Sequence, residues 1–287
     1  MIVVTGATGH LGRLVVKALL KTVPAGDIVA AARSPDKADD LAKAGVTVRQ
    51  ADYNRPETLD TAFAGADKVL LISSSEVGRR EAQHRAVIDA AKRAGVSLLA
   101  YTSLLHADIS PLGILAKEHR VTETLLRESG LPTVLLRNGW YNENYAAAIS
   151  QALAQNAVTG CAGEGLISSA ARADYAAAAA VVLTGDGHAG KTYELAGDGA
   201  YTLAELAAEI SRQSGTMVNY VNLTQAGYQE LLKQSGLPEP VAAMLADSGT
   251  GTSLGGLFDN GRQLSALIGR PTTPISQQVA EALNAAS

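Results

Sequence analysis

The first 138 residues alternate short apolar runs with helical patterns, and this alternation limits the possible folds more than any other feature. Runs rich in valine, isoleucine, leucine and alanine are typical of buried strands. They lie at 1–6, 27–33, 46–52, 67–74, 97–103 and 132–138. Helical patterns follow at 11–21, 35–45, 56–65, 81–94 and 117–129. Repeated strand–helix–strand units with near-continuous apolar strands predict a doubly wound parallel sheet, covered on both faces.

From about residue 139 this rhythm breaks. We expect a helix at 142–156, a buried helix near 174–185, a strand at 191–197 and an amphipathic helix at 202–215 that begins with a capping box. The glycine-rich segment 236–258 is expected to be irregular and partly mobile. The pattern therefore predicts an α/β protein. We expect residues 1–138 to form a Rossmann-type domain, to which elements near 174–197 return, and residues 139–287 to form mostly a smaller α+β lobe.

Charge and cysteine content narrow the function classes. A net charge of −4 gives no electrostatic reason to expect nucleic acid or an anionic membrane as a partner. The single cysteine, Cys161, excludes an internal disulfide, and no His, Asp and Glu spacing suggests a metal site. We expect a cytoplasmic protein that is a monomer or homodimer, inserts into no membrane and holds no metal.

A glycine-rich turn follows the first predicted strand, in "VTGATGHLG". Gly6 permits a sharp turn, Gly9 lets backbone N–H groups approach a pyrophosphate, and Gly12 lets the following helix pack closely on the strand. The phosphates would lie at the helix N-terminus, where unpaired N–H groups and the helix dipole favour negative charge. The predicted contacts are Gly6, Ala7, Thr8, Gly9, His10, Leu11 and Gly12.

The end of the second predicted strand indicates which dinucleotide binds. NAD-specific sites place an acidic residue there for the ribose 2′-hydroxyl, whereas this chain has Arg33, followed by Lys37. A guanidinium matches a 2′-phosphate, which a carboxylate would repel. We therefore expect NADPH as the cofactor, with NADH tolerated. The alternative interpretation is that Arg33 is an ordinary solvated surface charge.

Further cofactor contacts are expected after the other strands, because ligands of such sheets lie beyond the carboxyl ends of the strands. Tyr53 would stack on the adenine, and Ser73, Ser74 and Ser75 would contact the ribose and diphosphate, although ordinary turn roles fit these serines equally well. Asn138, Trp140 and Tyr141, in "RNGWYNENY" after the sixth strand, would lie near the nicotinamide and the substrate.

Several segments together resemble the NmrA-like group of atypical short-chain dehydrogenases/reductases. They are "VTGATGHLG", "ARSPDKADDLAKAGVTVRQADYNRPETL", "LLISSSEVGRR", "AYTSLLHADISPLG" and "LLRNGWYNENY". Within this group the similarity is greatest to the bacterial NAD(P)H:quinone oxidoreductases of type 2, with the triphenylmethane-dye reductases as close relatives. The resemblance extends over essentially the whole chain and implies an oxidoreductase.

Ordinary short-chain reductases carry a Tyr-x-x-x-Lys pair on the helix after strand five. Alignment on Glu123 and Leu126 places Leu115 and His119 in these two positions, so the pair is absent. Reduction of a simple ketone gives a strongly basic alkoxide that needs a positioned proton donor. Reduction of a quinone gives a phenolate, whose conjugate acid resembles tyrosine with a pKa of about 10. The absence of the pair therefore argues against an alcohol dehydrogenase and is compatible with a quinone reductase.

The resulting hypothesis is direct two-electron hydride transfer from nicotinamide C4 to a small-molecule quinone, giving a hydroquinone without a flavin. His119 would orient a ring or relay a proton, and Asn138, Asn142 or Asn144 would polarise the quinone carbonyl. Trp140 and Tyr141 would form a wall of the site. A helix residue bonded to nearby backbone is the alternative interpretation of His119. Two other functions stay open, a redox-sensing regulator that binds the dinucleotide without turnover and a reductase of triarylmethane-type dyes.

Overall fold

A seven-stranded sheet forms the centre of the first part of the computed structural model, which describes residues 1–286. The strand order is β3-β2-β1-β4-β5-β6-β8. β1 pairs in parallel with both β2 and β4, and the pairs β2–β3 and β4–β5 are also parallel. This is the Rossmann order, and it confirms the fold predicted from the sequence. The strands are β1 (Ile2–Thr5), β2 (Ile28–Ala32), β3 (Thr47–Gln50), β4 (Lys68–Leu71), β5 (Leu98–Leu104), β6 (Thr133–Asn138) and β8 (Thr192–Leu195).

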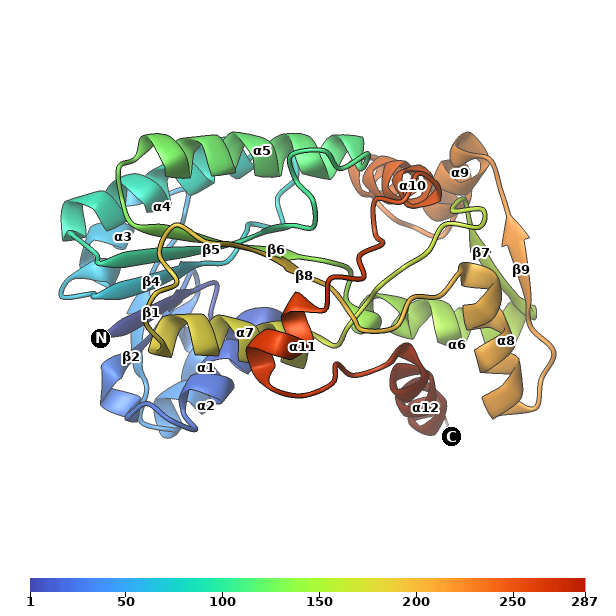
Figure 1. Ribbon diagram of the computed structural model, residues 1–287, viewed down its shortest axis with the longest axis horizontal. Coiled ribbons are helices and arrows are strands. Elements are labelled where there is room, and N and C mark those ends of the chain that lie inside the picture. The colour runs from blue at the N-terminus through green and yellow to red at the C-terminus, as the bar shows by residue number, and fades with distance from the viewer. Residues whose placement is uncertain (287) are drawn as a thin grey trace. The chain divides into compact units, whose positions relative to one another are not determined.

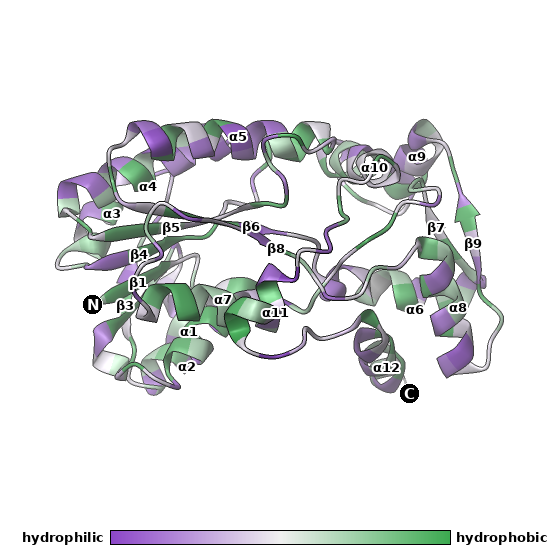
Figure 2. Ribbon diagram, viewed as in Figure 1, coloured by the Kyte–Doolittle hydropathy of each residue, from purple (hydrophilic) through white to green (hydrophobic). Residues whose placement is uncertain are grey.

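Helices cover both faces of this sheet (Figure 1). One face carries α1 (His10–Leu19), α2 (Asp39–Lys43) and α7 (Arg172–Thr184), and the other carries α3 (Pro56–Phe63), α4 (Arg80–Ala94) and α5 (Gly113–Glu128). The strands β1, β2 and β5 are buried along their whole length, as expected of strands covered on both sides. In Figure 2, α5 shows hydrophilic residues along much of its length, whereas β5 is mainly apolar.

Contacts along the chain define two units. Unit 1 comprises Met1–Leu104, Glu118–Arg137 and Arg172–Tyr193, and unit 2 comprises Leu105–Lys117, Asn138–Ala171 and the chain from Glu194 onward. Within unit 1, α7 packs against α1, so a segment from late in the chain completes the cover of the first strands. The division into a cofactor domain at 1–138 and a substrate lobe at 139–287 stays a prediction.

Unit 2 contains a small parallel sheet, in which β7 (Ala157–Gly160) pairs with β9 (Asn219–Asn222). Here α9 packs against α10, and α12 packs against α6 and α8. The predicted capping box is present, since the N–H of Glu205 donates to Thr202 Oγ1 and that of Thr202 donates to the Glu205 carboxylate. The helices are α6 (Ala146–Gln155), α8 (Leu203–Ser214), α9 (Gln225–Gln234), α10 (Glu239–Ser253), α11 (Gln263–Ile268) and α12 (Ile275–Ala286).

The expectation that 236–258 is irregular is wrong, because most of this segment forms α10. Its glycines permit close packing. A Cβ on Gly249 would lie 2.5 Å from Cys161 Sγ, and one on Gly251 would lie 3.0 Å from Leu112 Cα. Glycine lowers the stability of an isolated helix, and in α10 this close packing compensates for that loss.

Other differences arise from contacts between distant residues. The helix predicted at 117–129 begins four residues earlier, because the Asp247 carboxylate accepts a hydrogen bond of 2.9 Å from the N–H of Ile114 at the start of α5. The helix predicted at 142–156 is a 3₁₀ turn (Asn142–Tyr145) followed by α6, and 35–45 divides similarly into a 3₁₀ turn (Pro35–Ala38) and α2. A short 3₁₀ turn (Ala25–Asp27) precedes β2.

Within residues 1–286, no helix is both long and apolar enough to span a membrane.

Candidate active site

The glycine turn joins β1 to α1 as the sequence predicts. Gly6 has a φ of +58°, in the left-handed region that side chains disfavour. A Cβ on Gly12 would lie 2.3 Å from the Gly6 carbonyl oxygen and 2.7 Å from Ala7 Cα, so only glycine permits this approach of helix to turn. A Cβ on Gly9 would meet the Gly6 carbonyl oxygen at 3.2 Å, a tight but less severe contact.

The N-terminus of α1 suits a phosphate. Gly9 is the N-cap residue and no side chain caps the helix, so the N–H groups of the first turn can meet an anion. Two N–H groups of the preceding turn are already used, that of Ala7 by the Ala31 carbonyl and that of Gly9 by the Gly6 carbonyl. The N–H groups of Ala7 and Gly9 therefore have partners within the protein, and cofactor contact by the residues from Gly6 to Gly12 stays a prediction.

Arg33 and Lys37 lie just after β2, and both are exposed. Arg33 donates from Nη1 to Glu76 Oε1 at 3.0 Å, so its guanidinium is paired with a carboxylate from the loop after β4. The Lys37 carbonyl accepts a hydrogen bond from Arg13, which also binds the Thr8 carbonyl at 3.3 Å. Arg13 therefore ties the phosphate turn to the segment after β2.

Tyr53, Ser73 and Ser74 have clear structural partners. The Tyr53 hydroxyl donates to the Ile72 carbonyl at 2.9 Å and lies 2.5 Å from Thr5 Oγ1, and burial raises its pKa far above the ordinary value. The N–H of Ser73 donates to Thr102 Oγ1, and Ser74 Oγ accepts from the N–H two residues later, as a turn serine does. Ser75 is exposed. Cofactor contact by these residues stays a prediction.

His119 lies on α5 with its side chain buried, one turn after Leu115. Its Nδ1 is 2.7 Å from the Tyr101 hydroxyl, so its partner is a side chain and not the nearby backbone. Burial, with the neighbouring positive charge of Arg80, lowers the pKa of His119 well below its usual value. The imidazole is therefore neutral at pH 7, and its catalytic role stays a prediction.

Asn138 ends β6, and the residue is 5% exposed. Its Nδ2 donates to the Tyr141 hydroxyl oxygen at 3.3 Å, whereas Oδ1 is buried and has no hydrogen-bond partner among the residues described. A buried carbonyl without a donor is costly, so this atom is suited to a ligand that brings an N–H or O–H. Trp140 and Tyr141 are half-buried, and the Trp140 carbonyl accepts from the N–H of Ala170.

Sequence reasoning missed Glu76, which pairs with Arg33, and also Gln83 and Asn54, which are linked to Glu76 by hydrogen bonds. Gln83 Nε2 donates to Glu76 Oε2 at 2.9 Å and to Asn54 Oδ1 at 3.2 Å. A local signal existed, because Glu76 directly follows the serines after β4, but its pairing with Arg33 depends on the order of the strands. Residues 1–286 contain no group of three or more His, Cys, Asp or Glu side chains placed to hold a metal.

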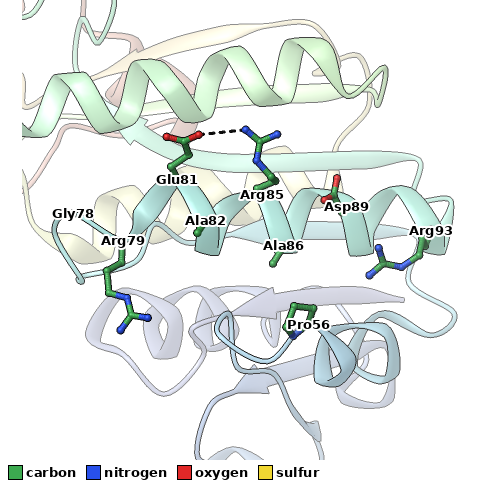
Figure 3. A pocket seen from close by; sticks show the side chains of 9 residues that line it. All are labelled: Pro56, Gly78, Arg79, Glu81, Ala82, Arg85, Ala86, Asp89 and Arg93. Atoms are coloured by element: carbon green, nitrogen blue, oxygen red, sulfur yellow. Dashed lines mark hydrogen bonds and ion pairs between the residues drawn. The ribbon is translucent and has the colours of Figure 1, made fainter.

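A surface pocket of about 530 Å³ lies along α4 (Figure 3). Arg85 and Glu81 form an ion pair of 3.3 Å beside it. The lining residues are Pro56, Gly78, Arg79, Glu81, Ala82, Arg85, Ala86, Asp89 and Arg93. None of them is a predicted cofactor or substrate residue.

Comparison with known proteins identifies the family. A family model described as NAD(P)H-binding matches residues 6–186. Quinone oxidoreductase 2 of Escherichia coli K12 is 57% identical over 284 residues, which make up 99% of each chain. The chain belongs to the NmrA-like NAD(P)H-binding family. This confirms the resemblance found in the sequence.

Two crystal structures resemble this NmrA-like protein closely. The E. coli NADPH-dependent quinone oxidoreductase complexed with NADPH gives a TM-score of 0.96 at 57% identity, covering 99% of this chain and 100% of that one. The Citrobacter sp. triphenylmethane reductase complexed with NADP(H) gives 0.91 at 39% identity, covering 98% of this chain and 100% of that one. Individual site residues of this NmrA-like protein stay predictions.

Proposed function

We propose that this chain is an NADPH-dependent quinone reductase that reduces a small-molecule quinone to a hydroquinone, without a flavin. The observation that carries the proposal is its 57% identity to E. coli quinone oxidoreductase 2 over 99% of both chains. A cytoplasmic location and a monomeric or homodimeric state belong to the same proposal.

The residues of unit 1 fit the phosphates of such a cofactor. The lack of a side chain at Gly12 lets α1 pack closely on the turn after β1, and the uncapped N-terminus of α1 offers N–H groups to the pyrophosphate. Arg33 is assigned to the 2′-phosphate, because a guanidinium can bind a phosphate through two parallel hydrogen bonds. NADPH, when bound, supplies the hydride.

In unit 2, the free acceptor of Asn138 fits a carboxamide N–H. Because Nδ2 faces Tyr141, the Asn138 side chain presents Oδ1 and not its amide N–H groups to a ligand. We therefore change its assignment from polarising the quinone carbonyl to holding the nicotinamide carboxamide, and assign Tyr141 to the wall against which the ring is oriented.

Little acid catalysis is required of the protein. A quinone accepts a hydride and a proton overall, and its phenolate product has a conjugate acid with a pKa of about 10, so water can supply the proton. The neutral, buried His119 fits an orienting role better than that of a proton donor, because its lowered pKa leaves the imidazole unprotonated at pH 7. Leu115 provides no proton.

The test combines purified protein, NADPH and 1,4-benzoquinone, followed by the absorbance of the reduced nicotinamide. We expect oxidation well above the uncatalysed rate, in protein whose visible spectrum has no flavin band. NADPH binding without oxidation would favour the regulator, and a flavin band that accompanies activity would contradict direct transfer.

Arg33→Asp tests the cofactor assignment. We expect its Kd for NADPH to rise at least tenfold, with a much smaller effect on NADH, since a bidentate charged contact is worth about 1.5–3 kcal/mol. Arg55→Asp is the matched control, because Arg55 is also exposed and paired with a single carboxylate, that of Glu57. Equal loss of both cofactors in Arg33→Asp would make Arg33 structural.

A second candidate function is the reduction of triarylmethane dyes, which the Citrobacter enzyme supports less strongly, at 39% identity against 57% for the quinone oxidoreductase. A panel of quinones and cationic dyes, compared by kcat/KM with NADPH fixed, separates the two substrates. A quinone reductase gives the higher value with the quinones.

A further inference from the structure

The loop after β4 supplies a carboxylate beside Arg33. Glu76 Oε1 lies 3.0 Å from Arg33 Nη1, and the two side chains are 33% and 67% exposed. NAD-specific sites carry such a carboxylate at the end of β2 itself. Here the sequence has arginine at that strand end, and the fold brings the acid to it from a strand two places along the sheet.

Glu76 is held by more than Arg33. Its N–H donates to Ser74 Oγ at 3.1 Å, and its second carboxylate oxygen, Oε2, accepts from Gln83 Nε2 at 2.9 Å. Both oxygens therefore have a donor, one from Arg33 and one from Gln83, and the carboxylate has a defined position.

Gln83 is buried on α4, and its contacts fix the orientation of its amide. Nε2 donates both to Glu76 and to Asn54 Oδ1, whereas Oε1 has no partner within the described part of the chain. Reversing the amide would set its oxygen against two other oxygens, so Nε2 must face Glu76. Gln83 is thus a positioning residue for the carboxylate.

We propose that Glu76, positioned by Gln83, limits the preference of this protein for NADPH over NADH by competing for Arg33. The proposal rests on the proposed function. A 2′-phosphate must displace the carboxylate from the guanidinium and is repelled by its charge. A ribose 2′-hydroxyl is neutral, can donate to Glu76, and requires no such displacement. The Arg33–Glu76 pair therefore makes the site tolerant of both cofactors.

The charge-removing variant Glu76→Gln tests this competition by direct binding titration with NADPH and with NADH. We expect the Kd for NADPH to fall about fivefold, which corresponds to the roughly 1 kcal/mol at the upper end for an exposed ion pair. The Kd for NADH is expected to stay constant or rise. Glu57→Gln is the matched control, because it removes the same charge from another exposed carboxylate paired with arginine, and it should change neither Kd.

Arg33 must mediate the effect. In an Arg33→Ala background, Glu76→Gln should change NADPH binding much less than it does in the wild type. Gln83→Met removes the donor to Oε2 at similar volume and should raise the NADPH/NADH preference in the same direction, with folding checked by Tm.

Three results would overturn the inference. They are equal changes in both Kd values for Glu76→Gln, a full effect that persists without Arg33, and an equal effect of Glu57→Gln. Failure of the proposed function is separate, because the wild-type protein would then fail to oxidise NADPH with a quinone whatever the variants do to binding.

Discussion

Replacing Gly12 by alanine should damage both stability and cofactor binding. The added Cβ would lie 2.3 Å from the Gly6 carbonyl oxygen, 2.7 Å from Ala7 Cα and 2.9 Å from the Gly6 carbonyl carbon. All three are backbone atoms, so no side chain can rotate away. Ordinary contact begins near 3.4 Å, and α1 must therefore move by about 1 Å relative to the turn. Overpacking of this kind costs about 1–3 kcal/mol of the free energy of unfolding.

The displacement also moves the N–H groups assigned to the pyrophosphate. We expect the Kd for NADPH to rise at least tenfold, measured by titration, and the urea midpoint to fall. Gly26→Ala is the control, because nothing lies within 4 Å of its Cβ, and it should change neither quantity. Gly9→Ala should weaken binding with a smaller loss of stability, since its contact is 3.2 Å. An unchanged urea midpoint and an unchanged Kd in Gly12→Ala would refute the reasoning.

Three further predictions follow from buried polar groups. Arg137→Met leaves the Glu123 carboxylate, which Arg137 binds through Nε at 3.0 Å and Nη2 at 2.8 Å, buried without its cation, and should cost about 3–5 kcal/mol in urea unfolding. Burial lowers the pKa of His84 to about 3, so the unfolded chain binds more protons than the folded one between about pH 3 and 6.5. The free energy of unfolding therefore falls as the pH drops through that window, and at pH 5 the loss is on the order of 2 kcal/mol. His84→Gln should reduce the slope of the free energy of unfolding against pH by about one proton. Asn138→Leu removes an unpaired buried acceptor, so its urea midpoint should stay constant or rise while its Kd for NADPH rises several-fold. A lower midpoint with unchanged affinity would instead make Asn138 structural.

Local patterns predicted the sheet and the phosphate turn because their causes are local. The strands β1 and β2 are almost wholly apolar and are buried along their whole length, and the spacing of Gly6, Gly9 and Gly12 reflects geometry within a single turn. The same reasoning failed for α10. The glycines that suggested an irregular segment pack against Cys161 and Leu112, which lie about 90 and 140 residues away in the chain.

The electrostatic setting of the site was equally inaccessible to local reasoning. The sequence indicated Arg33 from its place at the end of β2. Glu76 lies 43 residues further along the chain, and it comes close to Arg33 because β2 and β4 both lie beside β1 in the sheet. The orphaned acceptor of Asn138 is visible only when all the neighbours of its side chain are placed.

The return of α7 to the first strands has a consequence for synthesis. Val15, Val16 and Leu19 form the buried face of α1, and α7, which begins at Arg172, packs against this helix. A nascent chain that has emerged only to residue 138 exposes the part of α1 that α7 covers, and with it an aggregation risk. Synthesis must therefore pass through Leu105–Lys117 and Asn138–Ala171 of unit 2 and reach the end of α7 before the nucleotide-binding unit can close. A fragment ending at 138 should be insoluble, even though it contains every strand around the phosphate turn.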